Sequence, residues 1–339
     1  MEQFLNKIIC GDCIEVLREI KEPFADLIFA DPPFNIGYKY DKYYDKVKSK
    51  NYIAWTRDWM TVCKKVLKPD GSFYIAIGDE YAANVKVIAD ELGFFMRNWI
   101  IWHYTFGQQM KNKFARSHTH IFYFVNDSKN FTFNDHSVRE PSDRQLVYND
   151  KRANPVGKMP DDVWSHWSRI CGTFGHRKNW HPCHMPESLL AKIIRVSSNE
   201  GNWVLDPFSG SGTTAVVAAK LKRKYTGIEL SSEYAKKSRR RIENCKNLPI
   251  EGEGPREWTE HLVQELKWLY HENKVPTGQL NTDNDKLRLF TAKFNSIIKN
   301  EDNQFAPSEV MRRLIILRKS GRLGALREKP VQTNRGKTK

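Results

Sequence analysis

Apolar runs of strand length alternate with amphipathic helical patterns through most of the first 245 residues, and this alternation constrains the fold more than any other feature. The runs predicted to be strands are KIICGD, ADLIFA, SFYIAIGD, FFMRNWIIWHY, HIFYFV, NWVLDPF and YTGIEL. Helical patterns cover residues 51–68, 81–93, 186–198, 213–224 and 231–245, and PDG at 69–71 should stop the first of them. ADLIFA is apolar on both faces, as strands inside parallel sheets are. The chain is therefore predicted to be α/β, with one open, mostly parallel sheet.

The strand ADLIFA ends in an acid, two prolines and an aromatic ring, at Asp31, Pro32, Pro33 and Phe34. Proline donates no backbone hydrogen bond and restricts the residue before it, so this exit from the strand should be stiff. Such an exit would hold one carboxylate, carbonyl oxygens and one ring in a fixed relation. The plainer alternative is a rigid corner without chemistry.

A second strand ends in a glycine-rich turn, VLDPFSGSGTTA, at residues 204–215. Gly210 and Gly212 permit tight geometry and close approach of a ligand to the backbone. The amides that open the following helix, near Thr213, suit a carboxylate or phosphate. Glu229 ends the next strand, where an acid can accept hydrogen bonds from a ribose. This order of elements predicts a nucleoside cofactor.

A dinucleotide dehydrogenase would also fit, because Gly210, Gly212 and Ala215 have the G-x-G-x-x-A spacing. Two features oppose it: the loop lies late in the chain, and Asp206–Pro207 stands before the turn where glycine is usual. Asp206 suits a cationic ligand, such as an amino acid that carries a ribose. Because parallel strands deliver their loops to one edge of a sheet, both corners should be neighbours if their strands are adjacent.

The chain carries 55 Lys and Arg against 40 Asp and Glu, a net charge of +15, which favours a polyanionic partner. No apolar run approaches the roughly 20 residues that a membrane helix needs, so a membrane protein is not expected. The first residues have no signal-peptide pattern, and the six cysteines lie at scattered spacings. We therefore expect a protein of the reducing cytoplasm.

Together these motifs resemble those of the S-adenosylmethionine-dependent DNA amino-methyltransferases of the β group. ADPPF is similar to the catalytic motif, DPFSGSGTT to the cofactor motif, and GIEL to the segment with the ribose-binding acid. CGDC matches the segment that places an acid, here Asp12, beside the adenine of the cofactor. HPCHMPESLLAKII takes the place of HP-x-Q-K-P near the methionine end, with His184 and Met185 where Gln and Lys are usual.

The resemblance spans residues 8–245 and implies a Rossmann-like, seven-stranded, mostly parallel methyltransferase sheet with circularly permuted order. It divides the chain into a catalytic half (1–106), an inserted target-recognition region (107–180, with a core strand near 119–125) and a cofactor-binding half (181–247). A linker, LPIEGEGP, then precedes a helical C-terminal extension (256–339) of three or four short helices with a basic, disordered end.

The activity implied is methyl transfer from S-adenosylmethionine to the N6 amine of an adenine flipped out of duplex DNA, without a metal. The catalytic residues would be Asp31, Pro32, Pro33 and Phe34. The cofactor-binding residues would be Asp12, Asp31, His181, Pro182, Asp206, Pro207, Phe208, Ser209, Gly210, Ser211, Gly212, Thr213, Glu229 and Leu230. DPP accompanies adenine more often than cytosine in this family. Alternatives are an N4-cytosine DNA methyltransferase, an RNA or protein-glutamine methyltransferase, and a non-catalytic DNA-binding protein with a vestigial cofactor pocket.

The partner implied is double-stranded DNA, and both a cognate restriction endonuclease and a homodimer are compatible with the resemblance. Such proteins belong to the cytoplasm of prokaryotes or are encoded by phages and mobile elements. Sequence readout is best placed in residues 107–180, where the tryptophans either stack on bases or form a small core. Candidate DNA contacts are Lys111, Lys113, Arg116, Arg144, Arg152, Arg169, Arg177 and Lys178.

Two further patterns have plainer explanations. A zinc site would use Cys171, His176, His181, Cys183 and His184, but their spacing matches no standard finger or ribbon. The basic run KKSRRR, at residues 236–241, is predicted to be the solvated face of a helix rather than a binding site.

Overall fold

The computed structural model describes residues 1–39, 41–108, 111–139, 158–165, 184–248, 260–298 and 307–324, and the positions 152, 154, 167, 180, 250, 251, 258, 305 and 326. The chain divides into two compact units, Met1–Gly254 and Pro255–Lys339, and each is described by itself. Among the described helices, none combines the length and the apolar character needed to cross a membrane.

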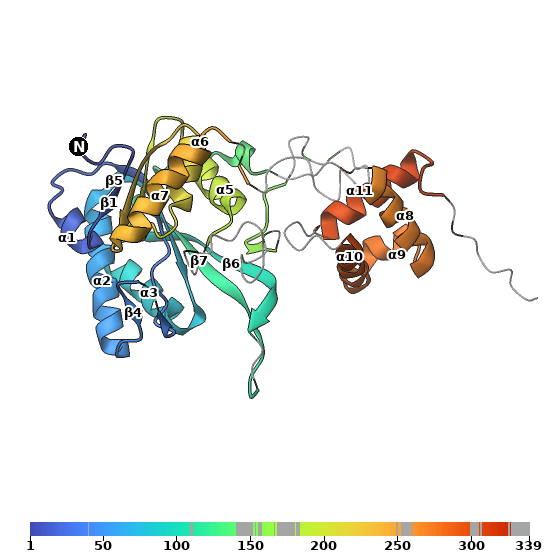
Figure 1. The fold of residues 1–339 in the computed structure, drawn as a ribbon, viewed down its shortest axis with the longest axis horizontal. Helices are drawn as coiled ribbons and strands as arrows, with labels where there is room; N and C mark the ends of the chain where they lie inside the picture. The colour runs from blue at the N-terminus through green and yellow to red at the C-terminus, as the bar shows by residue number, and fades with distance from the viewer. Residues whose placement is uncertain are drawn as a thin grey trace, which may run out of the picture. The chain divides into compact units, whose positions relative to one another are not determined.

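The first unit is built on one eight-stranded sheet (Figure 1). Its order is β1 (Lys7–Cys10), β10 (Lys224–Glu229), β9 (Trp203–Asp206), β2 (Ala25–Ala30), β5 (Leu67–Ile77), β7 (Arg116–Val125), β6 (Phe95–Gln108) and β8 (Val163–Trp164). The first five strands in this order, β1, β10, β9, β2 and β5, run parallel, whereas β7 is antiparallel to both β5 and β6. All seven predicted strands are therefore present, and the two-residue β8 adds an eighth.

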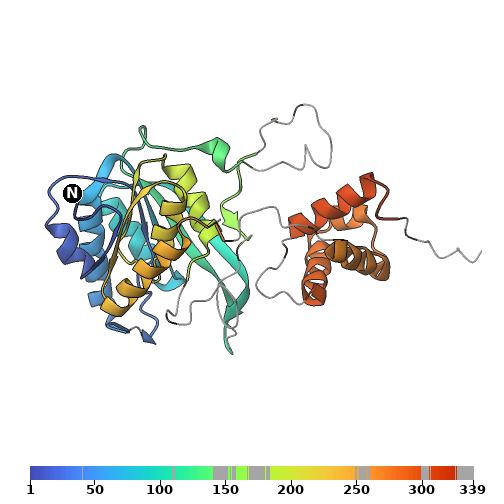
Figure 2. The ribbon, with the colours of Figure 1, turned by 45° about the horizontal axis from the view of Figure 1, so that its top comes forward.

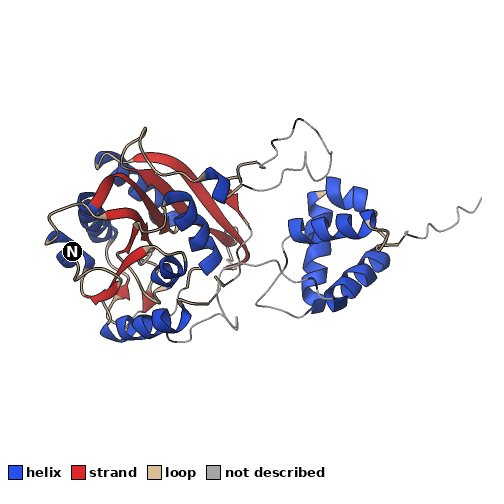
Figure 3. Cartoon of the chain, turned by 90° about the horizontal axis from the view of Figure 1, so that it is seen from above, coloured by secondary structure: helices blue, strands red, loops and turns tan. Residues whose placement is uncertain are grey.

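Helices cover both faces of this sheet, as Figures 2 and 3 show. On one face Ile28 and Phe73 pack with α1 (Cys13–Arg18), α2 (Ser49–Val66) and α3 (Asp79–Glu91). On the other face Leu27 and Phe29 pack with α5 (Glu187–Ser197) and α6 (Thr213–Lys220), and α7 (Ser232–Cys245) continues this layer beside β1. A short 3-10 helix, η1 (Asp135–Ser137), contacts α5. Adjacent residues of β2 thus enter opposite cores, which explains its unbroken apolar run.

The junction between α2 and β5 differs from the sequence prediction. The helix ends at Val66, and Leu67 already begins the strand, so PDG lies inside β5 instead of forming a separate turn. Ala25 pairs with Leu67 but Leu27 pairs with Ser72, so the residues between them bulge out of the ladder. A bulge accommodates proline and glycine within a strand, which local pattern rules assign to turns.

The second unit contains α8 (Glu260–Asn273), α9 (Thr277–Thr282), α10 (Asn284–Ile298) and α11 (Pro307–Lys319). These helices share a separate hydrophobic core in which Leu266, Phe294 and Leu314 are completely buried. Trp258 stacks on Phe294, with ring centroids 5.6 Å apart.

Candidate functional site

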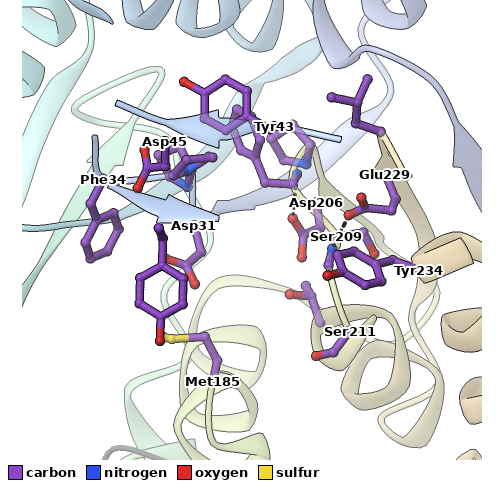
Figure 4. Close-up of a pocket in the computed structure, with 18 of the residues that line it drawn as sticks. Asp31, Phe34, Tyr43, Asp45, Met185, Asp206, Ser209, Ser211, Glu229 and Tyr234 are labelled. Carbon is purple, nitrogen blue, oxygen red and sulfur yellow. Dashed lines mark hydrogen bonds between the residues drawn. The ribbon is translucent and has the colours of Figure 1, made fainter. Parts of the chain in front are cut away.

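The carboxyl ends of β1, β10, β9, β2 and β5 meet at one edge of the sheet, where a cavity of about 370 Å³ opens. This volume lies in the range of roughly 300–1,000 Å³ that is usual for cofactor and ligand sites. β2 and β9 are direct neighbours, so the two aspartate–proline corners that follow them stand side by side. Figure 4 shows Asp31 and Phe34 on one side of the cavity and Asp206 and Glu229 on the other.

The first corner, residues 31–35, is held by two uncharged side chains and by the buried carboxylate of Asp45, which accepts the backbone amide of Asn35. Tyr52 donates its hydroxyl to the carbonyl of Pro33 at 2.6 Å. Asn35, which has a positive φ of 60°, donates its side-chain amide to the carbonyl of Val47 at 3.0 Å and to the Tyr81 hydroxyl at 2.8 Å. The left-handed conformation turns the chain sharply after Phe34, and asparagine tolerates it better than most residues do.

The Phe34 ring is half-buried and rests on the backbone of Gly78, the residue that follows β5. A Cβ atom at position 78 would lie 3.3 Å from Cδ2 of this ring, so only glycine leaves the ring its full space. Phe34 is thus fixed against a neighbouring strand end while one side faces the cavity.

The second corner is the glycine-rich loop between β9 and α6. Gly210 and Gly212 have φ values of 48° and 75°, which explains why glycine occupies both positions. The Ser238 hydroxyl of α7 donates to the carbonyl of Gly210 at 2.7 Å, and a Cβ atom on Gly212 would lie 2.9 Å from the Ser238 Cβ. Gly212 therefore allows the loop to pack on α7. Gly210 lines the cavity, whereas Gly212 does not.

A buried charged network supports this loop from behind, and sequence reasoning missed it. Arg241 donates to the carbonyl of Ser211 at 3.1 Å and to the Thr213 hydroxyl at 2.8 Å. Its other nitrogen pairs with Glu187 at 3.0 Å, and Lys220 pairs with the same carboxylate at 2.7 Å. The exposed fractions of the three charged side chains are 8%, 3% and 5% in that order, so the network is shielded from water.

Arg241 belongs to the run KKSRRR, for which a solvated helix face was predicted. Lys236 and Arg240 are exposed, as that prediction requires, but it is wrong for Arg241. Arg239 also departs from it in part, because it donates two hydrogen bonds to the carbonyl of Ile8, at 3.0 and 2.7 Å. The spacing along α7 alone could have suggested that position 241 shares a face with the buried Ser238 and Ile242.

Glu229, at the end of β10, is tied to both neighbouring turns. One carboxylate oxygen accepts the amide of Gly210 at 2.8 Å, and the other accepts the amide of Ser231 at 2.8 Å. Burial raises the pKa of Glu229, these two amides lower it, and the nearby charge of Asp41 raises it. Since a carboxylate has about four lone-pair positions, both oxygens still have acceptor capacity toward the cavity.

Asp206 is buried, and its carboxylate accepts the backbone amide of Phe208 at 2.9 Å. Burial raises the pKa of Asp206 to about 7, the hydrogen bonds from Thr214 and Phe208 lower it, and the charge of Glu229 raises it. A cation bound in the cavity would restore the charged form. Asp12 also lines the cavity, and one of its oxygens caps α1 by accepting the amide of Ile14 at 2.7 Å.

The cavity is acidic although the protein is basic. Its described lining includes the carboxylates of Asp12, Asp31, Asp41, Asp45, Asp206 and Glu229. Against these six acids stand Lys42 and Arg116, and Arg116 is already paired with Asp79 at 2.9 Å. The site therefore favours a ligand that carries positive charge at its centre.

The antiparallel strands supply a wall that the sequence patterns did not indicate. Trp102 and Tyr104 of β6 and His118 and Thr119 of β7 line the cavity. The Tyr104 hydroxyl donates to the carbonyl of His118 at 3.0 Å, which joins the two strands at this point. Alternation along a strand identifies buried positions but does not reveal which ligand site they face.

The remaining predicted residues fall into three groups. Pro32, Pro33, Pro207, Phe208, Ser209, Ser211, Thr213 and Leu230 line the cavity. Lys111, Lys113 and Arg152 are exposed, whereas Arg116 reaches the cavity. His181, Pro182, Arg144, Arg169, Arg177 and Lys178 lie outside the described residues. Of the five residues considered for zinc, His184 alone is described, and it lines the cavity beside Met185.

Comparison with known proteins gives a consistent result. A family model described as DNA methylase matches residues 25–240. The type II methyltransferase M.HpaI of Haemophilus parainfluenzae is 32% identical over 282 residues, which cover 79% of this chain and 88% of that protein. The DNA adenine methyltransferase YhdJ of Escherichia coli (strain K12) is 38% identical over 254 residues, 72% of this chain and 85% of that protein.

Among solved structures, the PvuII DNA methyltransferase, described as cytosine-N4-specific, superposes with a TM-score of 0.52 at 20% sequence identity. The match covers 72% of this chain and 94% of that one. At this level of identity the likeness concerns the fold. It confirms the predicted Rossmann-like α/β class.

Proposed function

The chain belongs to the N6/N4 DNA methylase family, and from that membership we propose that it methylates the N6 amine of an adenine flipped out of duplex DNA. The methyl donor proposed is S-adenosylmethionine. One observation carries the proposal: Asp31 of the first corner and Gly210 of the glycine loop line the same cavity, from the ends of adjacent strands.

The residues of the cavity suit this cofactor. An acidic cavity in a basic protein fits a molecule with an ammonium and a sulfonium group, and the buried Asp206 fits one of these cations. The remaining acceptor capacity of Glu229 fits two ribose hydroxyls, and Asp12 fits an adenine amine. Ser209 and Ser211 of the glycine-rich loop also line the cavity (Figure 4).

The first corner would act on the target base. The base must leave the duplex, because its amine is paired and out of reach inside the helix. Phe34, held against Gly78, would stack on it, and the Asp31 carboxylate and Pro32 carbonyl would accept hydrogen bonds from its amine. When bound, S-adenosylmethionine supplies an electrophilic methyl group for direct transfer to nitrogen. The protein contributes alignment and acceptors placed where positive charge develops on the amine.

Two observations support adenine as the target. The corner reads Asp-Pro-Pro-Phe, the form that accompanies adenine more often in the family that the sequence resembles. The relative YhdJ, 38% identical, is named a DNA adenine methyltransferase.

The type II relatives also favour a cognate restriction endonuclease as a partner of this chain.

The test is methyl transfer from labelled S-adenosylmethionine to unmethylated duplex DNA, RNA and protein in parallel, followed by digestion of the DNA to nucleosides. We expect label in duplex DNA and N6-methyladenine among the products. N4-methylcytosine instead would overturn the choice of base, and label in RNA or protein alone would overturn DNA as substrate. Protein that does not bind S-adenosylmethionine would refute the enzymatic function altogether.

A further inference from the structure

A hairpin segment, described at residues 36–39 and 41–50, follows the first corner directly and borders the cavity. Its two short strands, β3 (Tyr38–Lys39) and β4 (Tyr44–Asp45), pair antiparallel, with Tyr38 opposite Asp45 and Lys39 opposite Tyr44. Its described lining residues include Ile36, Tyr38 and Tyr43. The segment is therefore part of the cavity rim, although neither the sequence patterns nor the resemblance gave it a role.

Both acids of this segment accept hydrogen bonds from other groups of the protein. Asp45 is completely buried, and its carboxylate accepts the backbone amides of Asn35 at 2.5 Å and Ile36 at 3.2 Å. Asp41 accepts the Ser231 hydroxyl at 2.6 Å, which ties the segment to the turn after β10. Asp45 thus anchors the hairpin from within, and Asp41, although exposed, is bonded to the turn after β10.

The lysines of the segment have the opposite arrangement. Lys42, Lys46, Lys48 and Lys50 are all exposed, and none of them pairs with a carboxylate in the described part of the chain. Lysines elsewhere, such as Lys68 and Lys86, do find acidic partners. Lys46 and Lys48 lie between the end of β4 and the first residue of α2, Ser49. The segment offers a row of unneutralised positive charge beside an acidic cavity.

An exposed aromatic ring accompanies this charge. Cross-strand partners share a face of a hairpin, and Tyr38 and Asp45 both line the cavity. Tyr44 therefore lies on the other face, where it is 60% exposed. Lysines beside an exposed ring form the combination that binds phosphates and stacks on bases in nucleic-acid sites.

We propose that the hairpin segment is a DNA-binding surface of this protein, with Lys46 and Lys48 on phosphates next to the flipped nucleotide and Tyr44 against a neighbouring base. This inference rests on the proposed function, because it takes the duplex substrate as the partner. It assigns the surface to the chain directly after the catalytic corner, so binding of DNA and placement of Phe34 are mechanically joined through Asn35 and Asp45.

The test compares two double variants. Lys46→Gln with Lys48→Gln removes charge from the hairpin. Lys7→Gln with Lys21→Gln removes the same charge from exposed positions at the opposite edge of the sheet, where Lys7 is the first residue of β1 and Lys21 precedes β2. Binding of a mixed-sequence duplex is measured by fluorescence anisotropy over a series of salt concentrations. Each lysine on a phosphate contributes about 0.9 to the slope of log K against log salt.

We expect the hairpin variant to lose about 1.8 from that slope, with S-adenosylmethionine affinity unchanged, and the control variant to match the unmodified protein. Equal slopes for all three proteins would refute the hairpin segment as a DNA-binding surface and would leave the methyltransferase proposal intact. Failure of the unmodified protein to methylate DNA would instead overturn the proposed function.

Tyr44 is tested separately. Tyr44→Ala should lower DNA affinity by about tenfold, and Tyr44→Phe should retain it, because the ring face and not the hydroxyl makes the contact. Equal affinity of Tyr44→Ala and the unmodified protein would refute the stacking contact.

Discussion

The corners after β2 and β9 begin with the same residues, aspartate and proline, yet the protein supports them in different ways. The first is held by two uncharged side chains, Tyr52 and Asn35, and by a single buried carboxylate, Asp45, and its own acid is half-buried. The second lies on a buried network of Arg241, Glu187 and Lys220, and its acid is fully buried. Both the target base and the proposed methyl donor must be exchanged at every turnover, so the buried network holds the loop that receives the cofactor and not the cofactor itself. The environment, more than the motif, thus separates the roles proposed for these corners.

Among changes that separate the two corners, substitution of Asp31 should have the largest effect. Asp31→Ala should lower methyl transfer about a thousandfold, because acceptors aimed at developing charge are worth two to three orders of magnitude. Affinity for S-adenosylmethionine should stay within a few-fold, as measured by calorimetry, because Asp31 belongs to the other corner. Transfer close to normal would remove its assigned role.

Disruption of the buried network behind the second corner should have the next largest effect. Arg241→Met leaves Glu187 short of one partner inside the protein, which should cost about 3–5 kcal/mol of unfolding free energy. It should also raise the KM for S-adenosylmethionine more than it lowers kcat, because Ser211 and Thr213 lose their support. Urea unfolding and steady-state kinetics measure both. Arg240→Met, an exposed neighbour on α7, is the matched control and should change neither.

The buried acid of the second corner, Asp206, should make binding of the cofactor depend on pH. Because burial raises the pKa of Asp206 to about 7, its carboxyl carries a proton in the free protein below that pH. Binding of a cation requires the charged form, so the proton must leave. Affinity for S-adenosylmethionine should therefore rise about tenfold per pH unit up to about 7 and then level off. Calorimetry from pH 5.5 to 8.5 checks this, and Asp206→Asn should bind weakly without that slope.

The smallest expected effect concerns the support of the first corner. Tyr52→Phe removes one hydrogen bond to the Pro33 carbonyl and should cost about 1 kcal/mol of unfolding free energy. A few-fold lower kcat with unchanged S-adenosylmethionine binding would sharpen the contrast with Arg241. A larger change in cofactor affinity than in kcat would contradict the division of labour between the corners.

Much of this architecture is predictable from local pattern. Apolar runs such as ADLIFA identified every strand of the main sheet except β8, and Asp-Pro and Gly-x-Gly marked the two strand ends that become neighbours. These signals are local because proline and glycine act on their own dihedral angles and burial acts on a short period. They failed at PDG, where pairing with β2 turns an expected helix stop into a bulged strand.

Other features depend on contacts between distant residues. Arg241 resembles its exposed neighbours in sequence and is distinguished only by meeting Ser211 and Glu187. Gly78 matters because Phe34, 44 positions earlier, rests on it. Local patterns therefore specified the strands and the chemistry at their ends, since backbone preference and burial operate over a few residues. Only folding decided which side chains became buried partners, because desolvation and hydrogen bonding depend on whatever the rest of the chain brings alongside.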